Sequence, residues 1–187
     1  MIKANVKLDA KGLACPMPIV RTRKAVKELL EGQVLEVQAT DKGSTADLAA
    51  WAKSSGHQYI GTKEEGNVLY HYIRKCNADT KEGNTEVSYE PTIHNDDLLL
   101  REGLILDVRE SAEFAFGHIP GAVSIPLGEL ESRMNEIDSS KEIYVICRTG
   151  TRSDLAANML SNAGYKKVYN VLPGMTGWTH QLKKEVE

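Results

Sequence analysis

The chain has 187 residues, of which 41% are hydrophobic and 26% are charged, which is close to an average soluble protein. This length predicts one or two domains and excludes long repeat arrays and large barrels. Because no apolar run reaches the roughly 20 residues of a membrane span and the N-terminus lacks the apolar core of a secretory signal, we expect a cytoplasmic protein with no membrane partner. Three cysteines make a poor disulfide framework and are expected to be free thiols in that compartment.

The net charge of -3 is divided unevenly along the chain. Residues 1–78 carry 12 Lys and Arg against 8 Asp and Glu, whereas residues 79–187 carry 11 against 18. Neither half is basic enough for a dedicated nucleic-acid-binding protein. A basic cluster at positions 21, 23, 24 and 27 is interpreted as a solvated helix face, so we do not expect an RNA partner.

The first half, residues 1–75, alternates strand and helix signals and predicts a two-layer βαβαββ domain. The expected elements are a strand over 6–9, a helix over 16–30, a strand over 34–40, a helix that Ser44 caps and Gly56 ends, and a hairpin of strands 59–65 and 67–74. Hydrophobic periodicity then disappears in a stretch rich in Asn, Asp, Thr, Lys and Gly. We therefore place a linker at residues 76–85, long enough to let two domains meet in several orientations.

The second half, residues 86–187, alternates short apolar runs with helical patterns. Strands are expected over 104–108, 122–125, 142–146 and 167–171, and helices over 93–100, 111–116, 127–137 and 151–163. Such alternation predicts an α/β domain with a parallel sheet flanked by helices. Ligands bind beyond the carboxyl ends of the strands in folds of this kind, and that is where Asp107 and Cys147 fall.

Cys147 stands where an apolar strand gives way to a helix, at the head of the loop 147–152. We expect its sulfur in a nest of backbone N–H groups at a helix N-terminus, with Arg148 and Arg152 adding positive charge. All of these effects favour the thiolate, which is a good nucleophile. Gly150 permits the tight curvature that lets several N–H groups converge on one anion.

The length of this loop indicates which anion it can hold. A cysteine-dependent phosphatase has five residues between its cysteine and arginine, wrapped around a phosphate, whereas four separate Cys147 from Arg152 here. The smaller cradle suits a single persulfide sulfur better. A phosphatase or arsenate reductase on the same kind of loop is a further hypothesis, which failure to hydrolyse an aryl phosphate would remove.

A series of motifs around the loop resembles one known family. In chain order they are Leu106-Asp107-Val108-Arg109-Glu110, Glu113-Phe114, Gly117-His118-Ile119-Pro120-Gly121-Ala122, the loop from Cys147 to Arg152, and Gly174-Met175 with Trp178. Residues 87–178 resemble a single-domain rhodanese, of the thiosulfate sulfurtransferase family. The resemblance implies that Cys147 takes a sulfane sulfur from a small donor such as thiosulfate, becomes a persulfide, and passes the sulfur to a thiol or to cyanide.

The same resemblance implies roles for the neighbours of this cysteine. The cradle for the persulfide is expected to consist of Arg148, Thr149, Gly150, Thr151 and Arg152. Asp107 and Arg109 match the family's Asp-x-Arg signature and are expected either to orient the loop region or to form a structural ion pair. His118 matches a structural turn of the family, and we interpret it as structural rather than as a catalytic partner of the cysteine.

Cys15 opens the first predicted helix in the sequence Cys15-Pro16-Met17-Pro18. Pro16 and Pro18 suit a first helical turn, which would place Cys15 at the N-cap. The helix dipole and the basic residues at 21, 23 and 24 are then expected to lower its pKa and make it a reactive, accessible thiol.

The surroundings of Cys15 resemble a second family, the TusA/SirA sulfur carriers, over residues 6–75. The residues that carry this resemblance are the segment from Leu8 to Pro18, then Asp41, Asp47, Trp51, Gly56, His57 and the closing Tyr72-Ile73-Arg74-Lys75. The resemblance implies that Cys15 accepts a persulfide sulfur and hands it on.

Cys76 matches neither motif and is interpreted as a linker residue, with a third relay thiol or a resolving thiol as alternatives. Because the sequence has no Cys-x-x-Cys and no clustered histidines, we expect no metal site. No cofactor is expected other than the covalent persulfide itself.

These observations predict a two-domain sulfurtransferase that moves sulfane sulfur as a cysteine persulfide from a donor to Cys147 and then to a thiol or protein thiol acceptor that includes Cys15. Sulfur could equally flow from Cys15 to Cys147, or each cysteine could serve outside partners independently. The alternative is a persulfide-sensing or regulatory sulfur carrier with little turnover.

Overall fold

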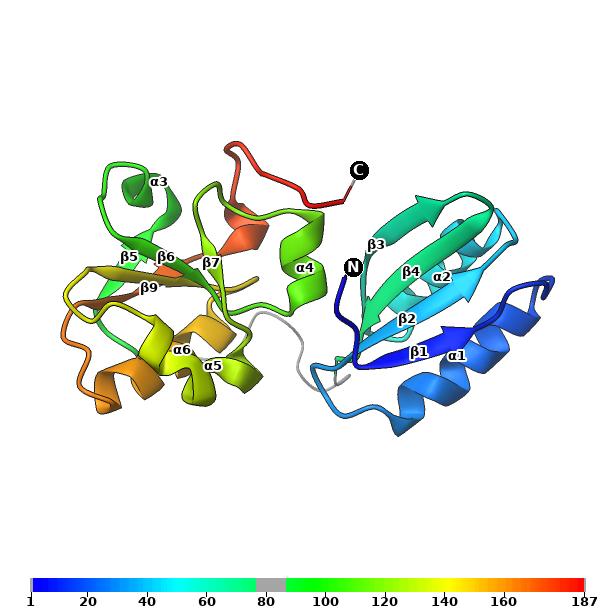
Figure 1. Cartoon of the computed structure of the whole chain (residues 1–187), viewed down its shortest axis with the longest axis horizontal. Coiled ribbons are helices and arrows are strands. Elements are labelled where there is room, and N and C mark those ends of the chain that lie inside the picture. Colours follow the sequence, from blue (N-terminus) through cyan, green and yellow to red (C-terminus); the bar gives the residue numbers. More distant parts are fainter. Residues whose placement is uncertain (1, 77–86, 187) are drawn as a thin grey trace. The chain divides into compact units, whose positions relative to one another are not determined.

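A computed structural model of the chain describes residues 2–76 and 87–186 (Figure 1). The chain divides into two compact units, Met1–Lys81 with Glu185–Glu187, and Glu82–Lys184. Of the predicted linker, residues 77–85 lie outside the described residues. No helix in the described ranges is both long enough and apolar enough to cross a bilayer.

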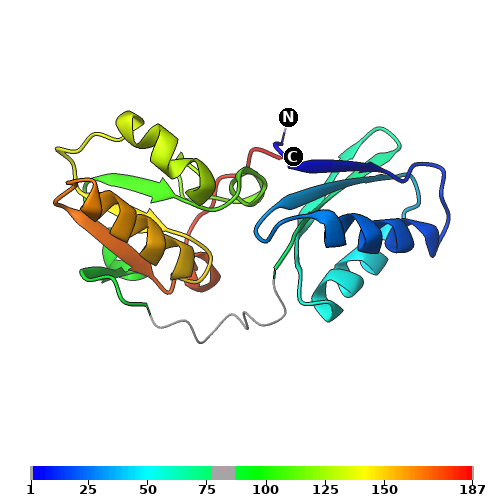
Figure 2. The same ribbon diagram turned by 90° about the horizontal axis from the view of Figure 1, so that it is seen from below.

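The first unit is a four-stranded sheet with both of its helices on one face (Figure 2). Its elements are β1 (Val6–Asp9), α1 (Met17–Glu28), β2 (Val34–Ala39), α2 (Ser44–Ser54), β3 (Gln58–Glu65) and β4 (Val68–Arg74). The strand order is β1-β2-β4-β3, in which β1 and β2 are parallel and the other pairs antiparallel. The predicted βαβαββ order is confirmed.

The helices of the first unit are held by an apolar face that repeats every four residues. On α2, Leu48 and Ala52 are fully buried, and they pack in one cluster with Leu35 and Val37 of β2. Burying side chains of this size contributes roughly 1.5–3 kcal/mol for each large aliphatic residue. The alternation along β2 and the helical period along α2 therefore place one shared core between sheet and helices.

The start of each helix differs from the prediction. The N-cap of α1 is Pro16 and no side chain caps this helix, so Cys15 precedes the N-cap instead of occupying it. The N-cap of α2 is Gly43 rather than Ser44. The Ser44 hydroxyl does not cap its helix because it donates to the Asp41 carbonyl at 2.5 Å and lies 2.9 Å from Nε2 of buried His71.

The second unit is a five-stranded, wholly parallel sheet in the order β5-β9-β8-β6-β7. Its elements are β5 (Thr92–His94), α3 (Asn95–Leu98), β6 (Leu104–Asp107), α4 (Ser111–Phe116), β7 (Val123–Ser124), α5 (Leu127–Arg133), the 3-10 turn η1 (Met134–Glu136), β8 (Ile143–Ile146), α6 (Thr151–Asn162), β9 (Val168–Leu172) and the 3-10 turn η2 (Met175–Gly177). The prediction of a parallel α/β domain is confirmed.

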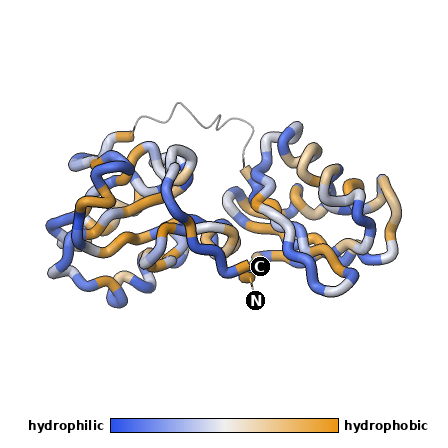
Figure 3. Tube along the Cα trace, turned by 90° about the horizontal axis from the view of Figure 1, so that it is seen from above, coloured by the Kyte–Doolittle hydropathy of each residue, from blue (hydrophilic) through white to orange (hydrophobic). Residues whose placement is uncertain are grey.

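Strand β8 lies in the middle of this sheet and is buried on both faces. Ile143 and Val145 join the core cluster that contains α5 and α6, whereas Tyr144 and Ile146 join the cluster that contains α3. A strand covered on both sides reads as an unbroken apolar run, which is why the sequence predicts it well. In both units hydrophobic residues lie on strands and on the helices that pack against them (Figure 3).

Two predicted helices of this unit are wrong in part. The segment predicted as a helix over 93–100 begins with β5, because Ile93 pairs with Val171 at the sheet edge, and only Asn95–Leu98 is helical. The helix predicted over 127–137 is α5 followed by the separate turn η1.

Candidate active site

Cys147 directly follows β8, and three residues separate it from the start of α6. Its side chain is 1% exposed. The neighbouring strand β6 ends at Asp107, so both residues lie at the carboxyl edge of the sheet. This is the edge at which parallel α/β folds bind their ligands.

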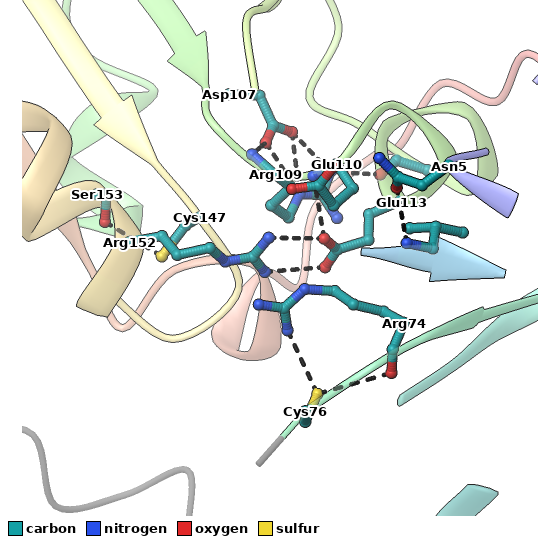
Figure 4. A network of polar contacts seen from close by, with 12 residues as sticks. Asn5, Arg74, Cys76, Asp107, Arg109, Glu110, Glu113, Cys147, Arg152 and Ser153 are labelled. Carbon is teal, nitrogen blue, oxygen red and sulfur yellow. Dashed lines mark hydrogen bonds and ion pairs between the residues drawn. The ribbon is translucent and has the colours of Figure 1, made fainter. Parts of the chain in front are cut away.

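The Cys147 sulfur lies within hydrogen-bond distance of two donors at the start of the helix. The Gly150 N–H donates to Sγ over 3.1 Å, and the Ser153 hydroxyl oxygen lies 3.3 Å from Sγ (Figure 4). Gly150 has a φ of +100°, a conformation that favours glycine. The sequence predicted backbone N–H groups around this sulfur and tight curvature at Gly150. It missed Ser153, which is visible in the sequence as a serine in the first turn of the helix that follows the cysteine.

The backbone of the loop is fixed from the other side by the segment after β9. The carbonyls of Cys147 and Arg148 accept N–H groups of Met175 and Thr176, each at 2.9 Å. A Cβ atom on Gly174 would lie 2.6 Å from the Cys147 carbonyl oxygen, so this close approach requires glycine. The segment after β9 therefore fixes the backbone that carries the Cys147 sulfur.

Arg152, predicted as part of the persulfide cradle, is held by Glu113 of α4. Its two terminal nitrogens lie 2.7 and 3.0 Å from the two carboxylate oxygens (Figure 4), and the side chains are 14% and 1% exposed. Burial by itself would lower the pKa of Arg152, but the charge and hydrogen bonds of Glu113 raise it above its ordinary value. The guanidinium is thus charged and ion-paired with Glu113, so its positive charge does not act on the Cys147 sulfur alone.

Glu113 is itself positioned by a capping box at the start of α4. The Glu110 N–H donates to its carboxylate at 3.1 Å, and the Glu110 side chain accepts from the Glu113 backbone N–H. The sequence placed Glu113 only within a motif and assigned it no role. A carboxylate that caps its own helix and pairs with the loop arginine connects α4 to the cysteine loop.

Asp107 and Arg109 form a buried ion pair. The Arg109 guanidinium donates to both Asp107 carboxylate oxygens, with the shortest contact at 2.6 Å, and to the Gly117 carbonyl at 2.8 Å. Of the two expected roles for this pair, these contacts agree with a structural ion pair. Nearby His118 is stacked on the Phe114 ring with centroids 3.7 Å apart, and its Nδ1 lies 2.9 Å from the Phe114 carbonyl, in agreement with its structural interpretation.

Cys15 is exposed, as predicted, but the expected direction of its pKa shift is wrong. The hydrogen bond with the Asp47 carboxylate raises the pKa of the thiol, and desolvation and the charges of Asp47 and Asp41 act in the same direction. An anion next to a thiol disfavours the thiolate. The basic residues of α1 follow Cys15 in the sequence, but the residues that act on it are Asp47 of the next helix and Asp41, which precedes that helix.

Replacing Asp47 by asparagine is expected to make Cys15 more reactive. Removing the carboxylate removes the largest cause of the raised pKa, so the pH midpoint of alkylation should move to lower pH and the rate at pH 7 should rise several-fold. The measurement is the iodoacetamide rate against pH in a Cys76→Ser, Cys147→Ser background. Glu28→Gln, at the far end of α1 roughly 18 Å along the helix axis, is the control and should leave the profile unchanged.

Cys76 is half-buried at the end of β4. Its sulfur lies 3.4 Å from Nη1 of Arg74, and its carbonyl oxygen lies 3.0 Å from Nδ1 of His57. These contacts attach Cys76 to the first unit, although the sequence placed it in the linker. Within residues 2–76 and 87–186, no three His, Cys, Asp or Glu side chains come together as they would have to around a metal ion.

Comparison with known proteins identifies two families along the chain. The family model described as Sulfurtransferase TusA matches residues 6–75, and the model described as Rhodanese-like domain matches residues 93–181. The first match coincides with the resemblance found over residues 6–75, and the second overlaps most of the resemblance found over residues 87–178.

Two curated relatives show how far the likeness extends. The Bacillus subtilis protein named "Putative sulfur carrier protein YrkF" is 51% identical over 185 residues, which cover 96% of this chain and 98% of that protein. The Sulfur carrier protein TusA of Allochromatium vinosum is 46% identical over 75 residues, which cover 40% of this chain and 99% of that protein. Among solved structures, a rhodanese-related protein from Thermoplasma volcanium is 31% identical with a TM-score of 0.47, covering 49% of this chain and 96% of that one.

Proposed function

Since this chain belongs to the family of proteins that join a TusA domain to a rhodanese-like domain, we propose that it moves sulfane sulfur from a donor such as thiosulfate to Cys147 and from there to a thiol acceptor that includes Cys15. The observation that carries the proposal is the position of the Cys147 sulfur, which lies at the carboxyl edge of the parallel sheet and accepts the Gly150 N–H. A backbone N–H held in place stabilises negative charge on sulfur without having to reorganise.

Uptake of sulfur is a displacement at the outer sulfur of the donor. The Cys147 thiolate attacks that atom, a new S–S bond forms, and the bond to the sulfonate sulfur breaks with its electron pair, so sulfite leaves. The product is the Cys147 persulfide anion. Arg148 adds positive charge to the loop that a dianionic donor such as thiosulfate must approach, whereas the charge of Arg152 is paired with Glu113.

Delivery of sulfur repeats the displacement with a second thiolate. The Cys15 thiolate attacks the outer sulfur of the persulfide, the S–S bond breaks, and the Cys147 thiolate is regenerated. Cys15 suits the role of acceptor because it is exposed and belongs to the domain matched by the TusA family model. Its thiol must first lose a proton, and the raised pKa makes that loss a cost at neutral pH.

Mass spectrometry of loaded variants tests the relay directly. Wild type, Cys15→Ser, Cys147→Ser and Cys76→Ser are incubated with excess thiosulfate, freed of donor, and examined for adducts of about 32 Da per sulfur atom, the signature of persulfidation. We expect sulfur on Cys147, and on Cys15 only when Cys147 is present. Loading of Cys15 in the Cys147→Ser variant, or absence of any adduct, would contradict the relay.

A persulfide sensor with little turnover is the second candidate. It is favoured by the burial of Cys147, whose side chain is 1% exposed, and by the raised pKa of Cys15. Sustained conversion of thiosulfate and cyanide to thiocyanate that is lost in Cys147→Ser would exclude it, because a sensor needs only one loading event.

A further inference from the structure

Ser153 is fully buried and shares one hydroxyl proton between two acceptors. It is the third residue of α6, and its Oγ lies 3.0 Å from the Gly150 carbonyl oxygen and 3.3 Å from the Cys147 sulfur. A serine in a helix ordinarily donates back to a carbonyl three or four residues earlier. Here the second acceptor is the Cys147 sulfur, the atom at which the proposed reaction forms and breaks bonds.

The Gly150 carbonyl does not depend on Ser153 for a hydrogen bond. It also accepts the Asp154 N–H at 2.9 Å and lies 3.3 Å from the Asn170 amide nitrogen. The Ser153 hydroxyl can therefore turn to the sulfur by rotation about its Cβ–Oγ bond alone, without leaving a buried carbonyl unpaired.

We propose that Ser153 is a catalytic residue that stabilises Cys147 as the leaving group when the persulfide releases its sulfur. The inference rests on the proposed function. In the persulfide Cys147–S–S⁻ the negative charge is on the outer sulfur, and Sγ carries little of it. The hydrogen bond from Ser153 to Sγ gains strength only as charge returns to that atom, because donors bind ionised acceptors more strongly than neutral ones.

Release and uptake of sulfur change the charge on Sγ in opposite directions. On release to cyanide, a carbon–sulfur bond forms, the S–S bond breaks, and its electron pair becomes the Cys147 thiolate while thiocyanate leaves. On uptake from thiosulfate, Sγ begins as the thiolate and loses charge as it attacks. An interaction that strengthens in one transition state and weakens in the other accelerates the first step only, so Ser153 should favour release over uptake by the thiolate.

Single-turnover kinetics of Ser153→Ala separate the two steps. Protein loaded with thiosulfate and freed of donor is mixed with cyanide and thiocyanate is followed, while unloaded protein is mixed with thiosulfate and sulfite is followed, both over a range of pH. We expect release to slow by about tenfold, the order of one hydrogen bond to a charge that is partly developed. Uptake at pH values where the thiol is fully ionised should not slow.

Matched variants separate a catalytic effect from a structural one. Ser161→Ala, an exposed position on the same helix, should leave both rates unchanged, and Ser153→Thr, which keeps a hydroxyl, should restore release. Equal slowing of both half-reactions, or unchanged release, in Ser153→Ala would overturn the role of Ser153 while the wild-type rates leave the proposed function standing. A wild-type protein that takes up no sulfur overturns both.

Discussion

Replacing Glu113 by glutamine is expected to lower the free energy of unfolding of the second unit by about 3 kcal/mol, the usual cost of leaving a buried charge without its partner. The two side chains are 14% and 1% exposed and meet through paired hydrogen bonds of 2.7 and 3.0 Å. Glutamine keeps the shape of the side chain and part of its hydrogen bonding, but it removes the carboxylate that pairs directly with the buried positive charge of Arg152.

The measurement is urea unfolding followed by tryptophan fluorescence. The chain has two tryptophans, Trp51 in the first unit and Trp178 in the second, so a Trp51→Phe background reports on the second unit alone. This separation matters because a chain of two units need not unfold in one step.

An exposed ion pair of the same unit provides the control. Arg133 and Glu136 meet at 2.8 Å, but their side chains are 33% and 49% exposed, and exposed pairs contribute at most about 1 kcal/mol. Glu136→Gln should therefore change stability by less than a third of the effect of Glu113→Gln. Similar losses in the two variants would show that Arg152 is not dependent on Glu113.

The parts of the fold that could be predicted are those whose signal is local. β8 is an unbroken apolar run and α2 repeats its apolar face every four residues, so each is visible within a few residues of sequence. β5 is three residues long and exists because Ile93 pairs with Val171, a partner 78 positions later. No short window of sequence contains that pairing.

The same distinction divides the candidate site. Cys147 and Gly150 belong to one six-residue loop and were predicted from it, whereas Glu113 comes from a different helix and was missed. The error over Cys15 has this origin too, because the basic residues of α1 are adjacent in sequence while Asp47 is 32 positions away and is brought near by the fold. Electrostatic surroundings depend on tertiary neighbours, and a list of nearby residue types does not reveal them.

Replacing Gly174 by alanine is expected to lower turnover strongly, although Gly174 lies outside the cysteine loop. Gly174 has a φ of +81°, and a Cβ atom there would lie 2.6 Å from the carbonyl oxygen of Cys147 and 2.8 Å from that of Arg148. Both obstacles are backbone atoms, so no side-chain rotation relieves them. Relief requires the loop itself to move.

We expect Gly174→Ala to destabilise the second unit by about 3 kcal/mol, from backbone strain and overpacking together, and to lower kcat/KM for thiosulfate and cyanide about 100-fold, the scale of a 1 Å misplacement at a reacting centre. Gly128→Ala is the matched control, since Gly128 lies in α5 with nothing within 4 Å of the added atom. It should gain up to about 1 kcal/mol of stability from helix propensity and keep its turnover. Steady-state kinetics and urea unfolding check both variants. The substitution cannot be accommodated unless the Cys147 backbone moves. A Gly174→Ala protein with wild-type kcat/KM would therefore mean that the position of this backbone does not limit the transfer of sulfur.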